Sequence, residues 1–341
     1  MIACHPMRDV QVFDKPSPEE FRAGIAKGDR PAVLRGIASE WPLVRTALEG
    51  DELCMSMLAE RASGAPIDVI RTEPANEGRF HYTPDGRALN FVRGRTDLPT
   101  FLAALEEQAG NEQPFALVAQ GVIAEPVLPG FASSHPMPFV PADATPRLWI
   151  GNSAKVATHN DPANNMAVVV AGRRRFTLFP PEQIANLYLG PLHLTPAGTP
   201  VSMVHVTAPD LDRYPRFSDA LQAAEVADLG PGDALFIPYA WYHHVEATAP
   251  FNLLVNYWWN SAEHDFGSPW DAMLHAMLSV RSLPAVQRAA WKAMFKHYVF
   301  ETDLGPAAHL PDDMAGVLGP MTDERAEQIR RKLIEALQRK G

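Results

Sequence analysis

The sequence predicts a mainly β protein, with a sandwich or barrel core between an α/β N-terminal region and a helical C-terminal region. Three observations support this fold class. Short apolar runs bounded by Gly and Pro dominate from about residue 113 to residue 260. The chain has 32 prolines among 341 residues, and most of them separate such runs. After about residue 265, apolar residues instead recur at helical spacing.

The first hundred residues alternate between helical and strand patterns. Ser17 is a suitable N-cap with Pro18 at the first helical position, and Gly110 is a suitable C-cap. Helices are predicted at residues 17–29, 51–63 and 98–110, and strands at residues 30–36 and 65–72.

The middle region carries short strand patterns in close succession. The run Gly230 to Asp233, "GPGD", is a turn signal between two of them. Strands are predicted within residues 114–120, 146–152, 155–161, 165–172, 174–180, 202–208, 225–238, 241–247 and 251–259.

Three helices are predicted in the C-terminal region, at residues 268–282, 284–300 and 322–340. Ser268 and Thr322 are suitable N-caps. We therefore expect a catalytic domain over residues 1–264 and a helical region over residues 265–341. The last helix has an apolar stripe, which fits either homodimerisation or packing onto the chain's own β core: Ala326, Ile329, Leu333, Ala336 and Leu337.

Composition narrows the classes of partner. The formal net charge is −10 and there is no basic block, which argues against nucleic acid. The start, "MIACHPMRDV", lacks a secretory signal pattern, and the apolar stretch Met166 to Ala171 is far shorter than the ~20 residues that span a bilayer. Cys4 and Cys54 give no disulfide framework, so we expect free thiols and a cytoplasmic location.

The stretch "THNDPANN" places His159 and Asp161 two residues apart on a predicted strand, where both side chains lie on one side. In "WYHHVEA", alternation puts His243 on the apolar side that faces the core and His244 on the other. Two histidines and a carboxylate are typical of non-haem Fe(II) oxygenases, although the same ligand types also bind zinc.

Structural explanations compete with a metal site. A His-x-Asp pair can arise by chance among 12 histidines. Asp161 precedes Pro162 and suits a turn, and His243 suits a core histidine bonded to a backbone carbonyl. A zinc hydrolase is weaker still, because the motif supplies no general base beyond the ligands.

Four ordered motifs, "HND", "GRRRFTLFPPEQ", "LGPGDALFIPYAWYHHVEA" and "VNYWW", resemble the cupin-like JmjC-type Fe(II)/2-oxoglutarate-dependent oxygenases. The pattern is most similar to the group of the asparaginyl hydroxylase that acts on hypoxia-inducible factor. The resemblance covers residues 113–260, and the flanking helices more loosely. It implies a double-stranded β-helix (cupin or jelly-roll) core that binds Fe(II) through His159, Asp161 and His243. It also implies dimerisation through the C-terminal helices.

The resemblance further implies a 2-oxoglutarate pocket. Arg174 stands where relatives have a lysine for the remote carboxylate, and alternation separates it from Arg173 and Arg175, unless all three form a solvated edge. Asn165 and Asn256 match pocket asparagines, although both residues also suit backbone bonding at strand ends.

Trp258 matches an aromatic residue that the family has beside the site, although an aromatic at this position also suits core packing. Two other positions depart from the family pattern. A pocket hydroxyl of the family is replaced by Val156, with Thr158 as the nearby hydroxyl, and a tyrosine is replaced by Leu117.

Two functions follow as hypotheses. The first is an Fe(II)- and 2-oxoglutarate-dependent hydroxylase of a protein side chain or a small molecule. The second is a metal-binding cupin-like module without oxygenase activity, which the replacements at Leu117, Val156 and Arg174 keep open.

Overall fold

Eight strands between residues 146 and 259 form the centre of the fold in this computed structural model, which describes residues 7–196, 198–262, 266–301 and 305–339. The chain divides into two units, Met1–Ser261 and Ala262–Gly341, and each is considered by itself. The eight strands are β8 (Pro146–Gly151), β9 (Ala154–Asn160), β10 (Asn164–Ala171), β11 (Arg174–Phe179), β12 (Glu225–Leu229), β13 (Ala234–Ile237), β14 (Tyr242–Ala247) and β15 (Asn252–Trp259).

These strands alternate between two sheets as a jelly roll requires. One sheet contains the neighbours β13-β10-β15-β8, and the other contains β12-β11-β14-β9. Consecutive strands switch sheets at every step except from β11 to β12. Both sheets are antiparallel within this set. The predicted double-stranded β-helix core is therefore confirmed.

Strands from the N-terminal region extend both sheets. Five of them widen the first sheet to nine strands: β2 (Gln11–Asp14), β3 (Ala32–Arg35), β4 (Pro66–Thr72), β6 (Phe91–Asp97) and β7 (Ala116–Ile123). Two short strands, β1 (Arg8–Asp9) and β5 (Arg79–Phe80), flank the second sheet. The sequence pattern had indicated β3, β4 and β7 and missed the other four, which are short or strongly exposed.

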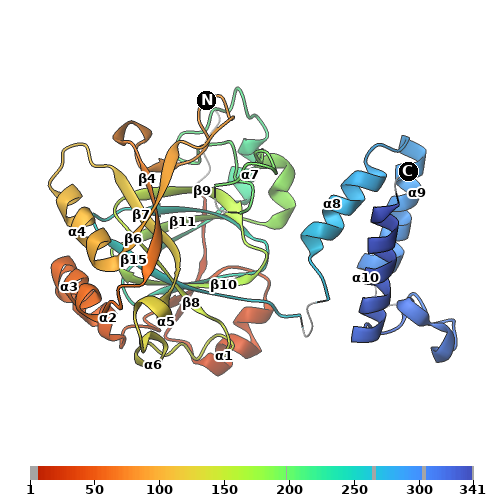
Figure 1. The fold of residues 1–341 in the computed structure, drawn as a ribbon, viewed down its shortest axis with the longest axis horizontal. Coiled ribbons are helices and arrows are strands. Elements are labelled where there is room, and N and C mark those ends of the chain that lie inside the picture. Colours follow the sequence, from red (N-terminus) through yellow and green to blue (C-terminus); the bar gives the residue numbers. More distant parts are fainter. Residues whose placement is uncertain (1–6, 197, 263–265, 302–304, 340–341) are drawn as a thin grey trace. The chain divides into compact units, whose positions relative to one another are not determined.

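Helices cover the outer face of the nine-stranded sheet (Figure 1), except for the last helix of this unit, which contacts β11 of the other sheet. Ser17 caps α1 by the predicted bond, as its Oγ accepts the Glu20 N–H at 3.1 Å. The helices of this unit are α1 (Pro18–Ala23), α2 (Pro42–Glu49), α3 (Asp51–Arg61), α4 (Leu98–Ala109), α5 (Ala124–Val127), α6 (Phe131–Ser134) and α7 (Phe217–Ala223). Short 3-10 turns lie at η1 (Ile25–Lys27), η2 (Pro74–Asn76) and η3 (Pro181–Asn186).

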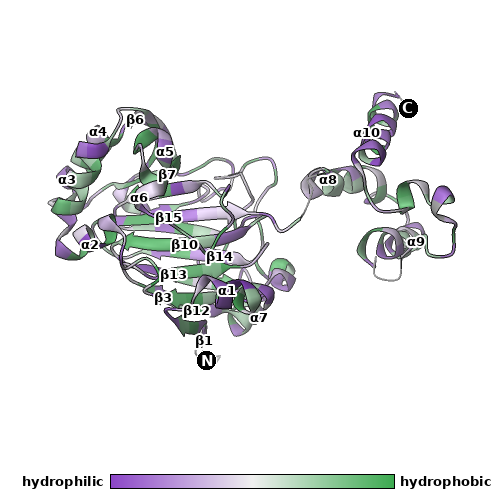
Figure 2. Cartoon of the chain, turned by 90° about the horizontal axis from the view of Figure 1, so that it is seen from below, coloured by the Kyte–Doolittle hydropathy of each residue, from purple (hydrophilic) through white to green (hydrophobic). Residues whose placement is uncertain are grey.

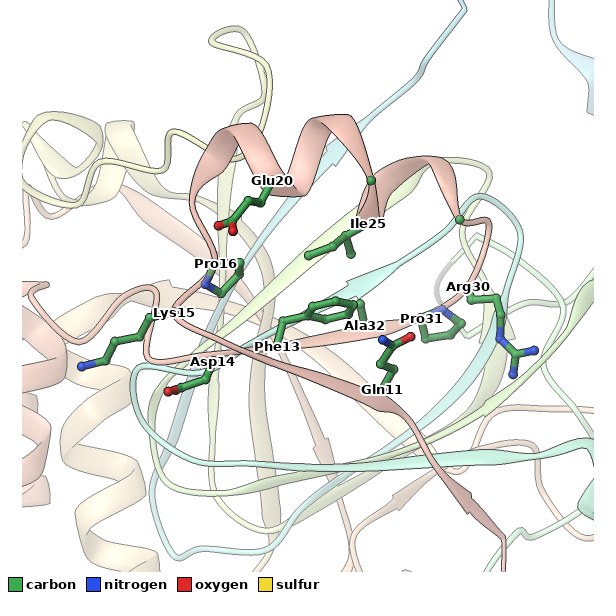
Figure 3. A pocket seen from close by; sticks show the side chains of 12 residues that line it. Gln11, Phe13, Asp14, Lys15, Pro16, Glu20, Ile25, Arg30, Pro31 and Ala32 are labelled. Atoms are coloured by element: carbon green, nitrogen blue, oxygen red, sulfur yellow. The ribbon is translucent and has the colours of Figure 1, made fainter.

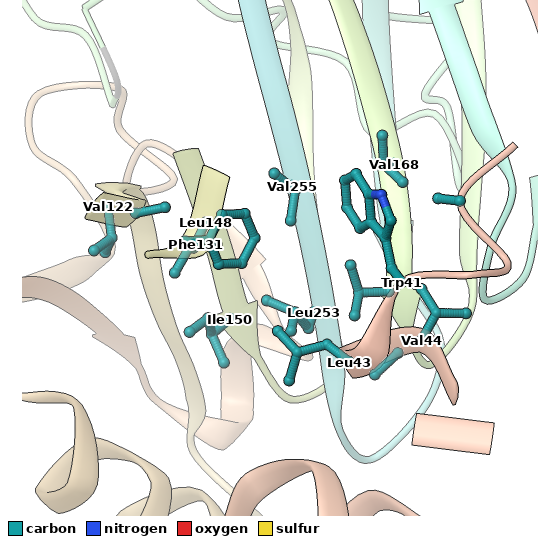
Figure 4. Close-up of a cluster of buried hydrophobic side chains, with 14 of the residues drawn as sticks. Trp41, Leu43, Val44, Val122, Phe131, Leu148, Ile150, Val168, Leu253 and Val255 are labelled. Atoms are coloured by element: carbon teal, nitrogen blue, oxygen red, sulfur yellow. The ribbon is translucent and has the colours of Figure 1, made fainter. Parts of the chain in front are cut away.

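Alternation along the central strands separates two apolar layers. Residues such as Leu148, Val168 and Val255 pack under the helices, where Trp41 and Leu43 meet them (Figure 4). The residues next to them on the strands face the other way, into the space between the sheets. There they belong to a second cluster, which includes Ala167, Val169, Phe176, Leu178 and Leu254. Figure 2 shows the strongly hydrophobic colouring of β10, which is buried on both faces.

The strand predicted at residues 202–208 is wrong. This segment is a loop with a single bridge, between Leu189 and Ser202. Ser202 Oγ donates to the Leu187 carbonyl and accepts the Val204 N–H. These side-chain bonds replace the backbone ladder that a strand would need.

The C-terminal unit contains α8 (Pro269–Val280), α9 (Ala285–Phe295), a π-helical turn η4 (Lys296–Phe300), the 3-10 turns η5 (Asp312–Met314) and η6 (Gly316–Leu318), and α10 (Asp323–Gln338). Among the described residues of this unit, Ala326 is the one buried apolar side chain. Leu278, Val286 and Phe300 are 73%, 83% and 76% exposed. These helices therefore bury little apolar surface against one another. In the described ranges, no helix has the length and apolarity needed to cross a lipid bilayer.

The layer under the helices gives the first testable prediction. Leu148→Ala deletes a fully buried side chain and should lower the free energy of unfolding by about 2–5 kcal/mol, which urea denaturation measures. Leu48→Ala is the control, because Leu48 is 67% exposed and its truncation should change stability by less than about 0.5 kcal/mol. Equal effects of the two substitutions would contradict the proposed layer.

Candidate metal centre

The pairing of β9 with β14 brings the two predicted histidine ligands side by side. His159, near the end of β9, lies opposite His243, near the start of β14, and their ring centroids are 4.4 Å apart. Asp161 follows in the loop after β9, where its carbonyl accepts the Ala240 N–H at 3.2 Å. Backbone hydrogen bonds thus hold all three positions at one end of the barrel.

A bulge in β9 sets which residues share the face of His159. His243 pairs with His159, and Val245 pairs with Val156. A step of two positions along β14 therefore matches a step of three positions along β9. Val156 therefore lies on the interior face with His159, although the two residues are an odd number of positions, three, apart. Thr158 lies within this bulge, where strand alternation does not hold. Its side chain is fully buried, and its hydroxyl has no hydrogen-bond partner in the described structure.

Both histidines have the ring orientation that a metal ligand needs. His159 Nδ1 lies 2.9 Å from the Ala157 carbonyl, and His243 Nδ1 lies 3.1 Å from the Trp241 carbonyl. A carbonyl only accepts, so each Nδ1 carries a proton, and in the neutral ring it is Nε2 that has the lone pair. The backbone two residues upstream fixes the tautomer in both cases.

The Asp161 carboxylate is held by two donors and faces a histidine. Its Oδ2 accepts from Asn165 Nδ2 at 3.2 Å and from Trp258 Nε1 at 3.1 Å. The same oxygen lies 3.6 Å from His243 Nε2. A carboxylate fixed in this way can bind a cation without first losing rotational freedom.

Ligand atoms of His159, Asp161 and His243 all lie within 4.8 Å of one another, and no other such group of three occurs among the described residues. Burial is the main cause that lowers the pKa of His243 to about 4, with a contribution from His159, while Asp161 opposes it. His243 is thus neutral at pH 7, the state in which imidazole binds metals. The donor set fits a divalent metal ion such as Fe(II).

Arg174 is the buried member of the three consecutive arginines. Arg173 is exposed, and Arg175 is partly exposed and pairs with Asp228 at 2.8 Å. Arg174 is only 9% exposed. Among the described residues, its guanidinium makes one hydrogen bond, from Nη2 to the Trp149 carbonyl at 3.3 Å, and its Nε has no partner. Burial lowers its pKa to about 10, so the guanidinium stays charged at neutral pH.

The position of Arg174 is set by the turn before it and by strand pairing. Gly172 has a φ of +73°, and a Cβ there would lie 2.4 Å from the Phe251 carbonyl oxygen, so the turn requires glycine. Arg174 pairs with Ala247, four residues along β14 from His243. At the usual rise, this is about 13 Å from the histidine along the strand.

The two predicted asparagines differ in their contacts. Asn165 donates to Asp161, while its Oδ1 is buried without a partner in the described structure. Asn256 Oδ1 accepts from Trp149 Nε1 at 2.9 Å, and no hydrogen bond between described residues joins Asn256 to the triad. Asn165 therefore belongs directly to the proposed centre, and Asn256 to the wall beside it.

Leu117 does not take the place that sequence comparison suggested. It packs with the cluster under the helices, while its neighbours Ala116 and Val118 lie in a different apolar cluster that includes Ala154 and Ala247. The side chain at position 117 therefore does not line the space between the sheets. Val156 does line it and brings no hydroxyl.

Sequence reasoning missed two residues of β8, Trp149 and Arg147. Trp149 borders the interior cluster, and Arg147 Cζ lies 5.5 Å from the centroid of the Trp258 ring. Both occupy alternate positions in "PRLWIGN". The sequence pattern could have identified them, because Arg147 and Trp149 alternate with the apolar Leu148. Residues that alternate on a strand lie on opposite faces, so both face the interior when Leu148 packs under the helices.

Two further features lie outside this centre. His244 is on the other face of β14, yet only 6% exposed, and neither of its ring nitrogens has a hydrogen-bond partner in the part of the chain that the structure describes. A cavity of about 550 Å³ lies at the edge of the nine-stranded sheet, where Ile25 faces Phe13 (Figure 3). Its lining residues all come from positions 11–32, so it contains none of the predicted ligands.

The chain matches the model of the cupin-like domain over residues 18–265. It is 32% identical over 280 residues to HSPB1-associated protein 1 homolog from Danio rerio, which is 80% of this chain and 62% of that protein. It is 26% identical over 264 residues to lysine-specific demethylase 8 from Danio rerio, 75% of this chain and 59% of that protein.

A shorter match joins the chain to lysine-specific demethylase JMJ31 from Arabidopsis thaliana, with 35% identity over 115 residues, or 33% of this chain and 20% of that protein. The chain thus spans less than two thirds of the length of each of these three relatives. The domain match covers most of the chain and includes both sheets of the jelly roll. The chain belongs to the cupin-like family of JmjC-type oxygenases.

Proposed function

We propose that this protein is an Fe(II)- and 2-oxoglutarate-dependent dioxygenase that hydroxylates a protein side chain or a small molecule. The main observation behind this proposal is that two imidazole Nε2 atoms and one carboxylate lie close together at one end of the jelly roll. His159, Asp161 and His243 would hold the metal through one face and leave its other positions open. Bound Fe(II) and 2-oxoglutarate together supply the oxidising chemistry that an unactivated C–H bond requires.

Arg174 supports 2-oxoglutarate as the cosubstrate. A buried guanidinium without a carboxylate partner is unfavourable, and no ion pair between described residues includes Arg174. A dicarboxylic acid that binds beside the metal would bring a second carboxylate towards this cation. The apolar side chains between them, such as Val156 and Phe176, exclude water and strengthen that attraction.

A metal-binding module without oxygenase activity is the alternative. It is favoured by the walls of the interior, because Val156 brings no hydroxyl and the Trp149 indole already binds Asn256. A pocket filled in this way has fewer polar groups for a cosubstrate than the family pattern provides.

We further propose that residues 1–264 form the catalytic part and that residues 265–341 mediate homodimerisation. The apolar stripe of α10 supports this, because Leu333 and Leu337 are 42% and 59% exposed within their unit. A cytoplasmic location is proposed from cysteine usage, since Cys54 is a buried free thiol.

Anaerobic titration tests the oxygenase proposal. Adding Fe(II) and then 2-oxoglutarate to the purified protein under nitrogen should give the weak visible charge-transfer band of the chelate, and air should then yield succinate. Absence of both the band and succinate would favour the metal-binding module. His243→Asn should abolish the band, because it removes one Nε2 ligand.

His244→Asn is the matched control for that substitution. His244 is the next residue, is equally buried and lies on the opposite face of β14. It should keep the band and the iron stoichiometry, with folding of both variants checked by circular dichroism. Loss of iron from folded His244→Asn, or its retention in His243→Asn, would refute the assignment of the ligands.

Arg174→Met tests the role of the buried cation. Replacing an unpaired buried charge with an apolar side chain should raise the free energy of unfolding by on the order of 1 kcal/mol or more in the absence of ligand. The same variant should bind 2-oxoglutarate much more weakly. Arg175→Met, on the same strand but paired with Asp228 at the surface, should change neither quantity appreciably. A destabilised Arg174→Met would indicate a structural role instead.

Sedimentation equilibrium tests the dimer. The 37.5 kDa chain should sediment at twice its mass, and a chain ending at Ser261 or the full chain with Leu333→Glu and Leu337→Glu should sediment as a monomer. Leu48→Glu in the β unit, where Leu48 is also exposed, should leave the dimer intact. A monomeric wild-type chain would indicate that the stripe covers its own β unit.

A further inference from the structure

Arg147 is a second cation on the inner face of the jelly roll. On β8 it alternates with Leu148 and Ile150, which pack under the helices, so its side chain leaves the strand on the opposite face. Its neighbour across the pair of strands is Asn256 of β15. Arg147 and Arg174 therefore belong to opposite sheets, β8 in one and β11 in the other.

A short chain of contacts links Arg147 to the proposed centre. Its guanidinium stacks on Trp258, with Cζ 5.5 Å from the ring centroid. The same indole donates from Nε1 to Asp161 Oδ2 at 3.1 Å. A single aromatic ring thus separates this cation from the carboxylate of the triad.

The donors of Arg147 are largely unused by the described residues. Among them, Arg147 makes one side-chain hydrogen bond, from Nη1 to the Gly121 carbonyl at 3.4 Å, and it takes part in no ion pair. Arg35, which is also partly buried, differs in that it is paired with the carboxylate of Asp233 at 2.6 Å. Stacking occupies the face of a guanidinium and leaves the N–H groups at its edge available.

Arg147 and Arg174 also differ in access. Arg174 is buried between the sheets, with 9% of its surface exposed, whereas Arg147 is only half-buried. A group that arrives from solvent after the cosubstrate would therefore meet Arg147 rather than Arg174. A carboxylate fits the edge of a stacked guanidinium with two parallel hydrogen bonds.

We propose that Arg147 binds a carboxylate of the substrate, so that this protein acts on an acidic molecule. The proposal rests on the proposed oxygenase function, because it places the acidic group next to the residue that holds the metal ligand Asp161. The carboxylate can belong to an aspartate or glutamate side chain of a peptide, or to a small organic acid.

Binding of model acids to the full chain tests this inference. The probes are capped hexaglutamate, capped hexaglutamine and free glutarate, each titrated calorimetrically at low salt. Hexaglutamate should bind with a Kd about tenfold or more below that of hexaglutamine. Arg147→Gln should abolish this preference, and Arg147→Lys should keep part of it. Arg147-dependent binding of glutarate at a comparable Kd would identify a small acid, and its absence an acidic peptide.

Arg213→Gln is the matched control, because Arg213 also stacks on an aromatic ring, 5.2 Å from the Tyr214 centroid, but lies elsewhere. It should leave all three affinities unchanged. The proposal is overturned if Arg147→Gln binds hexaglutamate as the wild type does. It is also overturned if 2-oxoglutarate displaces hexaglutamate completely, since Arg147 would then serve the cosubstrate.

These titrations are independent of turnover and need no iron. If the charge-transfer band is absent while Arg147-dependent binding persists, the oxygenase proposal fails and the acidic-ligand site stands. If the band forms while hexaglutamate and glutarate show no dependence on Arg147, the substrate inference fails and the oxygenase proposal stands.

Discussion

Antiparallel hydrogen bonding between β9 and β14 is the interaction on which the proposed centre depends. It sets His159 opposite His243 and orders the loop that carries Asp161. The bulge in β9 then determines that Val156, three residues earlier, shares the same face. One pair of strands therefore fixes both the donor atoms and part of the wall beside them, and a shift in register would separate the ligands.

The interior of the jelly roll combines a polar mouth with an apolar body. Asn165 and Trp258 direct two donors at one oxygen of Asp161, while Phe176 and Leu178 fill the space further along β11. Arg174 is the exception, a charged side chain held at depth with few partners. Such a residue reduces the stability of the free protein, which is a common property of positions kept for a ligand.

Strand alternation and turn residues made much of the fold and the triad predictable from sequence. "THNDPANN" and "WYHHVEA" pointed to His159, Asp161 and His243, and strand alternation accounts for the two histidines, whereas Asp161 lies in the loop after β9, where alternation does not apply. The same reasoning failed at residues 202–208, where serine side-chain bonds replace a ladder, and at Leu117, where the correct face depended on pairing with strands far away in sequence. Contacts such as Trp258 with Asp161 join residues 97 positions apart, which local patterns do not encode.

Each histidine of the triad is oriented by a main-chain carbonyl, and no side chain is needed to hold its ring. Substitution of the surrounding residues therefore leaves the direction of both Nε2 lone pairs unchanged, as long as the two strands stay paired. In such a scaffold the metal chemistry and the shape of the pocket can evolve separately. An arginine in place of a lysine then alters which molecules enter the pocket and leaves the positions of the three candidate ligands unchanged.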